Sequence, residues 1–405
     1  MKVLHVITGL DAGGAELQLA MILTRTRHES DVVTLYNPGP VAEQIRAAGT
    51  SVRDVGMRSN TELAALAKLY RLIRDGHYDV VHAHLYRAQI YARPAARLAR
   101  TPVVLTTEHS IGETHIERRK MTSGVRALYL ASELFSDATI AVSDIVKERL
   151  VRWGVPARKI TTVPNGVNID EIAFDPAARQ RVRAQFGIAP ETYVIGSLGR
   201  LDPNKRVDLL MEAAAPILSE RCKILVIGRG EDLARLESAA ARLAVTDNVI
   251  FGGYQSDTTA MLSAFDLFAA TSLQETFGLS VLEALANGLP ALYTTCPALD
   301  GIETDRARQV NGEVDALRGA IQNEFAVGTR PRVVPTEVFE RYGIQSVVDR
   351  IDDLYEQVLT RRPKRRIREV ARRQSPPRPI ALQVPPAQSE VPERDDSYSH
   401  AVGET

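Results

Sequence analysis

Two glutamates stand eight positions apart in the stretch SLQETFGLSVLEALANGLP, residues 272–290. Glu275 precedes a predicted helix, and Glu283 falls on that helix four residues after Leu279, at the margin of its apolar stripe. A carboxylate can accept hydrogen bonds from two neighbouring hydroxyl groups, such as those of a ribose or another sugar. Because an inward glutamate without partners is costly, we interpret both as ligand-binding residues. The alternative for Glu283 is a side chain that reaches solvent from the helix edge.

The start of the same helix offers a second kind of chemistry. The backbone N–H groups of Gly278, Leu279 and Ser280 come in the first turn, where a helix leaves its donors without intrahelical acceptors. Together with the helix dipole, such donors form a binding site for a phosphate group. The segment Asn-Gly-Leu-Pro at 287–290 then ends the helix.

Two cations follow an earlier predicted strand. The segment GRLDPNKR, residues 199–206, carries Arg200 and Lys205 on either side of a Pro-Asn turn. The forked donors of an arginine and the point charge of a lysine would together hold a diphosphate. Taken alone, the segment is also compatible with ordinary surface charge.

A glycine loop lies near the N-terminus, between the first predicted strand and the next helix. In GLDAGGAE, residues 9–16, Gly13 and Gly14 would let backbone N–H groups approach an anion closely. The glycine spacing does not match the dinucleotide-binding fingerprint, and the second predicted strand ends in Leu-Tyr-Asn without an acid for a ribose. NAD binding is therefore disfavoured, and a purely structural turn is the alternative.

Short apolar, β-branched runs alternate with amphipathic stretches, a pattern typical of βα units that build parallel sheets. The predicted strands of the first half are 2–8, 31–37, 51–57, 79–84, 103–109, 138–143 and 159–165. After a predicted linker with a short helix at 166–190, the strands are 193–200, 223–230, 248–253, 267–272 and 290–295. We therefore predict an α/β protein with two Rossmann-like, doubly wound domains facing each other across a cleft, and ligands at the carboxyl ends of the strands.

Length and composition restrict the class of protein. The 405 residues are enough for two domains, and 44% of them are hydrophobic. The 50 basic and 50 acidic residues balance, so no global charge suggests nucleic acid as a partner. The two cysteines, Cys222 and Cys296, have neither metal-binding nor redox spacing and indicate a reducing compartment. We found no signal-peptide core and no apolar run of membrane-spanning length, so we expect a cytoplasmic protein.

The C-terminal part differs in character. We predict domains at 1–166 and 167–345, a helix at 346–362 that crosses back to the first domain, and a disordered, proline-rich tail at 363–405. Residues 361–373 carry eight basic residues and one acidic residue. This run is either simply solvated or attracted to an anionic membrane at the inner membrane face. The basic segment 115–135, predicted as helical, is either a surface helix or a rim that meets a lipid-linked or anionic acceptor.

Taken together, these motifs resemble a known family. The segments ETFGLSVLEALANGLP, GRLDPNK, VSDIVKERLVRWGVPARKITTVPNGVN and the early GGAE resemble the family-4 retaining glycosyltransferases of the GT-B fold, over about residues 1 to 360. The resemblance implies transfer of a sugar from a nucleotide-diphosphate sugar to an acceptor, with retained configuration and without a bound metal or other cofactor. The first domain is then the acceptor side and the second binds the nucleotide sugar.

The resemblance also implies roles for single residues. Arg200 and Lys205 would hold the donor diphosphate and neutralise the leaving group, Glu283 would bind the ribose, and Glu275 would lie near the transferred sugar. Gly13 and Gly14 resemble the loop that approaches the donor phosphates and the acceptor. His109, at the end of TTEHS, resembles a histidine beside the reacting sugar. Tyr254, after the third predicted strand of the second domain, is a candidate for the wall beside the nucleobase.

The sequence departs from the family at one place. Family members commonly continue after the Asn-Gly-Leu-Pro with a glycine-rich segment ending in Pro-Glu, whereas this chain reads ALYTTCPALDGIETDRARQVNG. We expect a glycosyltransferase that acts on a cell-envelope glycan or a lipid-linked intermediate. The alternatives are a nucleotide-sugar epimerase of GT-B architecture and a catalytically weak relative that recruits partners.

Overall fold

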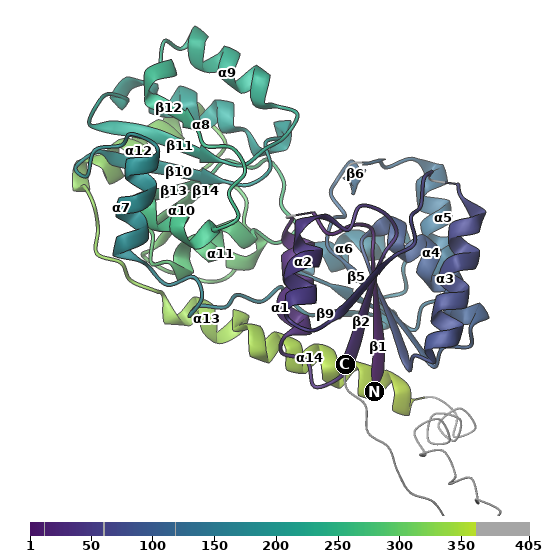
Figure 1. Cartoon of the computed structure of the whole chain (residues 1–405). Coiled ribbons are helices and arrows are strands. Elements are labelled where there is room, and N and C mark those ends of the chain that lie inside the picture. Colours follow the sequence, from purple (N-terminus) through teal and green to yellow (C-terminus); the bar gives the residue numbers. More distant parts are fainter. Residues whose placement is uncertain (12, 60, 118, 362–405) are drawn as a thin grey trace, which may run out of the picture.

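Two parallel β-sheets form the framework of the protein (Figure 1). The computed structural model describes residues 1–361 except 12, 60 and 118. The first sheet has the strand order β3-β2-β1-β4-β5-β8-β9. Its strands are β1 (Lys2–Ile7), β2 (Glu29–Thr34), β3 (Ser51–Asp54), β4 (Val80–His84), β5 (Val103–Glu108), β8 (Ala138–Ala141) and β9 (Ile160–Thr162).

The second sheet repeats this plan with the order β12-β11-β10-β13-β14-β15. Its strands are β10 (Tyr193–Leu198), β11 (Cys222–Ile227), β12 (Val249–Phe251), β13 (Leu267–Ala270), β14 (Ala291–Tyr293) and β15 (Ala307–Gln309). The strand order reverses between β1 and β4 in one sheet and between β10 and β13 in the other. Ligands of doubly wound sheets bind at such reversal points, at the carboxyl ends of the strands.

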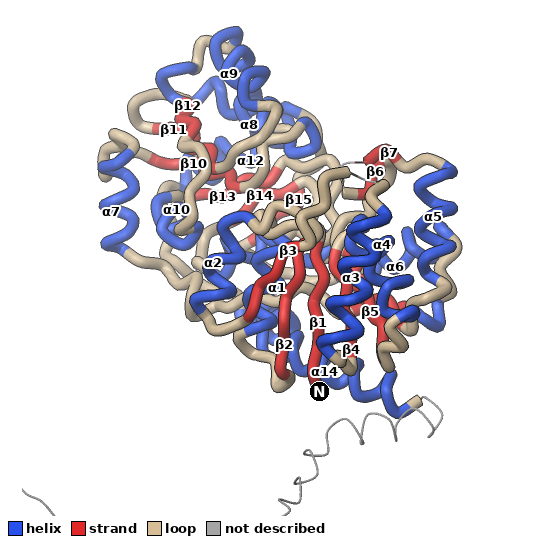
Figure 2. The backbone as a smooth tube through the Cα atoms, turned by 45° about the vertical axis from the view of Figure 1, so that its right-hand side comes forward, coloured by secondary structure: helices blue, strands red, loops and turns tan. Residues whose placement is uncertain are grey.

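Helices cover both faces of each sheet (Figure 2). On β1, Leu4 and Val6 belong to the same hydrophobic cluster as Leu69 of α3 (Leu63–Gly76), whereas Val3 belongs to the cluster of Val348 of α14 (Ile344–Thr360), because successive strand residues point to opposite faces. The helices of the first half are α1 (Gly14–Leu23), α2 (Gly39–Ala47), α3 (Leu63–Gly76), α4 (Tyr86–Leu98), α5 (Ser123–Glu133) and α6 (Asp144–Trp153). Those of the second half are α7 (Pro176–Gln185), α8 (Val207–Ala214), α9 (Leu233–Arg242), α10 (Thr258–Ala264), α11 (Leu279–Ala286), α12 (Val314–Val327), α13 (Thr336–Tyr342) and α14 (Ile344–Thr360).

The last described helix, α14, returns to the first sheet and packs under it (Figure 1). Buried Asp352 accepts hydrogen bonds from Thr26 Oγ1 at 2.8 Å and from the backbone N–H of Arg27 at 3.0 Å. The Tyr355 hydroxyl lies 2.6 Å from His82 Nδ1 on β4. The chain therefore crosses between the domains twice, as predicted.

The structure confirms the predicted α/β class with two doubly wound sheets, and it corrects three local expectations. Residues 115–116 and 119–120 are not helical but form the antiparallel strands β6 (His115–Ile116) and β7 (Arg119–Lys120), and the helix starts only at Ser123. Strand β15 lies in the segment that departs from the family pattern and was not predicted. The helix after Glu275 begins at Leu279, with Gly278 as its N-cap residue.

Two further predictions concern the C-terminal tail and membrane-spanning segments. The predicted tail at 363–405, with most of the basic run 361–373, lies outside the described residues. Among the helices that the structure describes, none combines the length and the apolar character that crossing a membrane requires.

Candidate active site

Loops from the two sheets meet where the strands end. The Glu113 backbone N–H, beyond β5, donates to Gln274 Oε1 at 3.0 Å, and Ser143 Oγ, beyond β8, donates to the Thr276 carbonyl at 2.6 Å. A Cβ atom at Gly14 would lie 3.5 Å from Leu279 Cδ2. The predicted glycine loop and the start of α11 therefore face each other across the domain boundary.

A pocket lies at the carboxyl ends of β10 and β13, the reversal point of the second sheet. Its lining includes four of the residues that surround the predicted diphosphate site: Gly199, Arg200, Lys205 and Ser280. Glu275, Glu283 and Tyr254 are not among the described residues that line it. The predicted cations and one residue of the predicted helix start thus share one cavity.

The two predicted cations have different partners. Arg200 Nε lies 2.8 Å from Asp202 Oδ2, and half of the Arg200 side chain is exposed (51%). Lys205 Nζ lies 2.6 Å from Glu275 Oε1, in a pair that is mostly shielded from water (24% and 19% exposed). The structure therefore joins Lys205, predicted to bind the diphosphate, and Glu275, predicted to lie near the sugar, in one ion pair.

Side chains without a predicted role hold these loops together. Asn204 Nδ2 donates to the Gln274 carbonyl at 2.9 Å, and the Gln274 backbone N–H donates to Asn204 Oδ1 at 3.1 Å. Thr271 Oγ1 lies 2.8 Å from the carbonyl oxygen of Lys205. A Cβ atom at Gly228 would collide with the carbonyl of Gly199, so the loops after β10 and β11 can approach only through glycine. A glycine directly after a strand is the signal that could have identified Gly228.

The start of α11 is shaped by Gly278. This residue has φ +97°, in the left-handed region, and a Cβ atom there would collide with Cys296 Sγ. Among the described residues, the backbone N–H groups of Gly278, Leu279 and Ser280 have no hydrogen-bond acceptor. They are therefore open donors at a helix N-terminus, as an anion site requires.

Glu283 lies one turn further along α11 and is half-buried. Its carboxylate forms no hydrogen bond or ion pair within the described part of the chain, and burial raises its pKa to about 7. A carboxylate that is partly desolvated and lacks a protein donor is available to a ligand with hydroxyl groups.

The first domain adds Glu16, to which we had assigned no role although it belongs to the predicted GGAE motif. Burial first, and then the negative charges of Asp11 and Glu117, raise the pKa of Glu16 to about 7, while Arg200 of the other domain acts in the opposite direction. A Cβ atom at Gly13 would collide with the Glu16 carboxylate, so the glycine leaves space for this side chain. The charge of Arg200, predicted to bind the diphosphate, therefore acts on the pKa of Glu16 in the other domain.

His109 follows β5 and is half-buried. Its Nε2 lies 3.4 Å from His84 Nδ1, and its Nδ1 is buried without a partner among the described residues. Burial lowers the pKa of His109 to about 4, so the ring is neutral at pH 7. The loop that follows reaches Gln274, the neighbour of Glu275.

Tyr254 lies on the loop after β12 and is 39% exposed. The Arg229 guanidinium covers one face of its ring, 5.1 Å from the centroid, and also lies 3.4 Å from Asp11 of the first domain. Tyr254 is therefore near the domain boundary and is not among the residues that line the pocket of Arg200 and Lys205.

Two family models match the chain in the same order as the two sheets. The model described as "Glycosyltransferase Family 4" matches residues 16–171, and the model described as "Glycosyl transferases group 1" matches residues 178–317. The chain belongs to the family-4 glycosyltransferases. The family that the sequence motifs indicated is therefore confirmed, and the protein belongs to a family of glycosyltransferase enzymes.

Individual proteins are similar over most of the chain. An Escherichia coli enzyme named UDP-Gal:alpha-D-GlcNAc-diphosphoundecaprenol alpha-1,3-galactosyltransferase is 25% identical over 308 residues, which cover 73% of this chain and 79% of that protein. The D-inositol 3-phosphate glycosyltransferase of Mycolicibacterium smegmatis is 29% identical over 334 residues, 75% of each chain. The solved structure of Anabaena Alr3699/HepE in complex with UDP-glucose has a TM-score of 0.76 at 22% identity and covers 88% of this chain and 100% of its own. This likeness confirms the GT-B fold.

Proposed function

We propose that this glycosyltransferase uses a nucleotide-diphosphate sugar as its donor and transfers the sugar with retention of configuration, without a bound metal. The single observation that carries the proposal is that two cations and the start of a helix meet in one pocket, at the point where the strand order of the second sheet reverses. Arg200 and Lys205 line the same pocket as Ser280, whose backbone N–H is an open donor at the start of α11. Such an arrangement of fixed positive charge suits a diphosphate.

The remaining groups extend the site in two directions from the diphosphate. Glu283, unpartnered within the described residues, would accept hydrogen bonds from the ribose hydroxyls. On the other side, Glu275 beside Lys205 and His109 from the first domain would contact the transferred sugar. Tyr254 would stand near the nucleobase. The solved structure of Anabaena Alr3699/HepE contains UDP-glucose, which supports this class of donor.

In the proposed reaction, the bond between the sugar C1 and the diphosphate oxygen breaks while the acceptor oxygen bonds to C1 on the same face. The electron pair of the broken bond remains on the diphosphate oxygen, which takes the proton of the acceptor hydroxyl. Arg200 and Lys205 stabilise the negative charge that develops there, and the protein otherwise contributes orientation.

We propose a cell-envelope glycan or a lipid-linked intermediate as the acceptor. The Escherichia coli relative is named for a diphosphoundecaprenol-linked substrate, which supports this class. The two relatives are both transferases by name, so the epimerase and recruitment alternatives gain no support from them.

A panel of UDP-, GDP- and ADP-sugars, followed by product analysis, tests the donor and the stereochemistry. We expect one nucleotide series to raise the melting temperature, because a ligand that binds only the folded state stabilises it. The anomeric configuration of the product, read by NMR, should equal that of the donor. Activity that survives extensive chelation would support metal independence, whereas an inverted product would refute the proposed mechanism.

We also propose peripheral contact with an anionic membrane through the basic run 361–373, at the inner face of the membrane. The test compares the full chain with a chain that ends at residue 361, using vesicles with and without anionic lipid. Equal binding of the two chains would contradict the proposal.

A further inference from the structure

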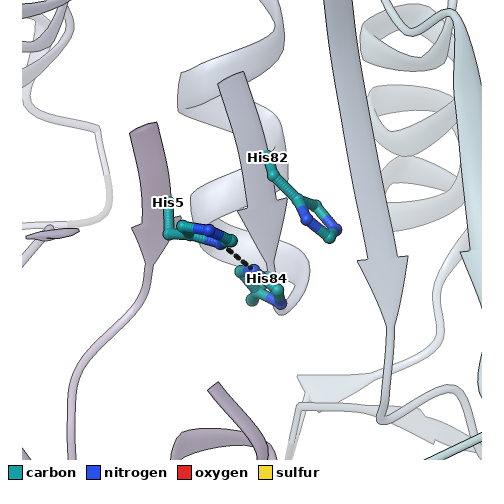
Figure 3. Close-up of side chains that lie close together, drawn as sticks. All are labelled: His5, His82 and His84. Atoms are coloured by element: carbon teal, nitrogen blue, oxygen red, sulfur yellow. Dashed lines mark hydrogen bonds between the residues drawn. The ribbon is translucent and has the colours of Figure 1, made fainter. Parts of the chain in front are cut away.

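Four histidines of the first domain lie close together. His5 on β1 pairs in register with His82 on β4, His84 follows two residues later, and His109 follows two residues after Thr107, the neighbour of His84 in register. Because strand side chains alternate, His5, His82 and His84 point to the same face. His109 comes directly after β5, and its Nε2 lies 3.4 Å from His84 Nδ1. Figure 3 shows three of them, His5, His82 and His84.

The hydrogen bonds divide the four rings into a chain and a separate ring. His5 Nδ1 lies 3.1 Å from His84 Nε2, and His84 Nδ1 lies 3.4 Å from His109 Nε2. His82 stands beside His84, with 4.2 Å between the ring centroids, but both of its nitrogens bond elsewhere: to the Tyr355 hydroxyl at 2.6 Å and to Thr107 Oγ1 at 2.7 Å.

This pattern argues against a metal site. One nitrogen each of His5, His82 and His84 lies within 4.8 Å of the others, as three metal ligands could. However, both nitrogens of His82 have short hydrogen bonds to hydroxyl groups, so a metal could take the His82 ring only by breaking one of them. Only His5 and His84 would remain, and they already satisfy each other.

The three chain members have coupled tautomers. Burial lowers the pKa of His5 to about 3 and holds the pKa of His84 well below its usual value, so both rings, like His109, are neutral at pH 7. A neutral imidazole has one N–H donor and one acceptor nitrogen. If His84 Nδ1 donates to His109 Nε2, then His84 Nε2 must accept from His5, and the proton of His109 is on Nδ1. If the donor and acceptor exchange roles in one of these hydrogen bonds, they must also exchange roles in the other, and the proton of His109 then moves to Nε2.

The chain ends on His109 Nδ1, which is buried and has no partner in the part of the chain that the structure describes. Buried nitrogens without a hydrogen-bond partner are rare in proteins, so we infer that Nδ1 bonds to a group of the bound ligand. Diphosphate oxygens only accept hydrogen bonds, whereas sugar hydroxyls both donate and accept them. A protonated Nδ1 can therefore bond to both kinds of oxygen, and an unprotonated Nδ1 only to a hydroxyl.

We propose that His5 and His84 are positioning residues that act as a hydrogen-bonded relay and hold His109 in the tautomer with its proton on Nδ1, directed at the sugar donor. The inference rests on the proposed function, since it requires a donor next to His109. His5 and His84 need not touch the substrate. The relay is thus distinct from the structural role of His82, which joins β4 to α14.

Two replacements of His84 test the relay in the full chain. In His84→Asn the side-chain amide takes the place of Nδ1 and keeps the bond to His109, whereas in His84→Gln it takes the place of Nε2 and keeps only the bond to His5. We expect His84→Gln to lower kcat about two- to tenfold, as the loss of one neutral hydrogen bond would, with the donor KM unchanged. His84→Asn should restore most of kcat.

Nitrogen NMR of the histidine rings supplies a readout that needs no activity. In the unchanged protein at pH 7, His109 should carry its proton on Nδ1, and His84→Gln should give a mixture of tautomers. His5→Phe should shift the His109 signals as well, although the structure shows no contact between these rings. The matched control is His82→Gln, a change in the same cluster that should lower the melting temperature and leave both kcat and the His109 signals unaltered.

The outcomes of these experiments distinguish the relay from a purely structural histidine cluster and from a metal site. Equal effects of the His82 and His84 variants on kcat and on the His109 signals would overturn the relay in favour of a structural cluster. Stoichiometric zinc or another metal whose removal shifts the His5 and His84 signals would overturn it in favour of a metal site. If the His109 signals respond to His84→Gln but no nucleotide sugar is consumed, the relay stands and the proposed function fails.

Discussion

At the scale of single residues, the carboxylates of the candidate site have different surroundings. Glu275 is held beside Lys205 at 2.6 Å, whereas Glu283 has no partner among the described residues and titrates near neutral pH, at a pKa of about 7. Glu16 in the first domain has a pKa of about 7 as well. Ligand binding at this site should therefore depend on pH within the physiological range.

The first prediction concerns Lys205. Lys205→Ala should lower kcat/KM by about 10²- to 10³-fold, because one charge-stabilising donor to the leaving group is lost. It should also weaken UDP binding in calorimetry. Lys223→Ala is the matched control, since Lys223 belongs to the same domain and its ammonium pairs with Glu220 at 3.4 Å. Equal activity of the two variants would exclude Lys205 as a diphosphate ligand.

The second prediction concerns the pH dependence of Glu283. In the proposed site the ionised carboxylate would accept hydrogen bonds from both ribose hydroxyls. Because its pKa without ligand is about 7, UDP affinity should rise as the pH increases from 6 to 8. Glu283→Gln should show no such rise. In the free protein, a carboxyl whose folded pKa is raised contributes stability below its unfolded pKa of about 4.3 that is lost as the pH rises through 7. Relative to the unchanged protein, the melting temperature of Glu283→Gln should therefore increase as the pH rises from 5 to 8. A pH-independent difference would contradict the assignment.

At the scale of elements, the start of α11 is placed by backbone geometry rather than by a capping side chain. Gly278 adopts φ +97° directly over Cys296, and this turn leaves the first N–H groups of the helix open. The loop before it is joined to the β10 loop through Asn204. The position of the predicted phosphate site therefore depends on the packing between two loops.

The third prediction tests this turn. Gly278→Ala introduces left-handed strain and a collision with Cys296 Sγ, so it should destabilise the fold by at least about 1 kcal/mol and weaken UDP binding. Gly319→Ala is the control, because Gly319 lies within α12 with open space around it and alanine favours a helix by about 0.5–1 kcal/mol. The two variants should shift the denaturant midpoint in opposite directions. A stable Gly278→Ala variant with unchanged UDP affinity would show that the turn does not matter.

At the scale of the whole molecule, the two domains are connected by contacts at the site and by α14. The ion pair of Asp11 and Arg229 crosses the boundary, but both side chains are mostly exposed, so it adds little stability. By contrast, buried Asp352 on α14 accepts hydrogen bonds from Thr26 Oγ1 and from the Arg27 backbone N–H. The chain that leaves the second domain is therefore anchored under the first.

The fourth prediction concerns this anchor. Asp352→Asn should lower the unfolding free energy of the first domain by about 1–3 kcal/mol, because an amide cannot accept both hydrogen bonds and leaves a buried donor unsatisfied. Differential scanning calorimetry should show the first-domain transition at a lower temperature. Asp349→Asn, on the same helix but exposed, should have almost no effect. Equal melting curves for both variants would show that Asp352 does not anchor α14.

Much of the architecture could be predicted from local patterns. The alternation of apolar runs with amphipathic stretches identified the strands of both sheets except β15, which has only three residues, Ala307–Gln309, in a polar segment. The strand pair of residues 115–116 and 119–120 was missed because basic residues such as Arg119 and Lys120 fit a helix surface as well as a two-residue strand. The motifs around Arg200, Lys205, Glu275 and Glu283 indicated the chemistry, and their assigned roles stay predictions.

What the sequence by itself determined is therefore the class of fold, the family and the chemical nature of the candidate site, since these follow from periodicity and from motifs contiguous along the chain. Only the tertiary structure decided which groups meet. The pairing of Lys205 with Glu275 and the chain from His5 through His84 to His109 each join residues 25 to 79 positions apart. Such contacts depend on strand register and on the packing of loops across the domain boundary, and no local pattern encodes either.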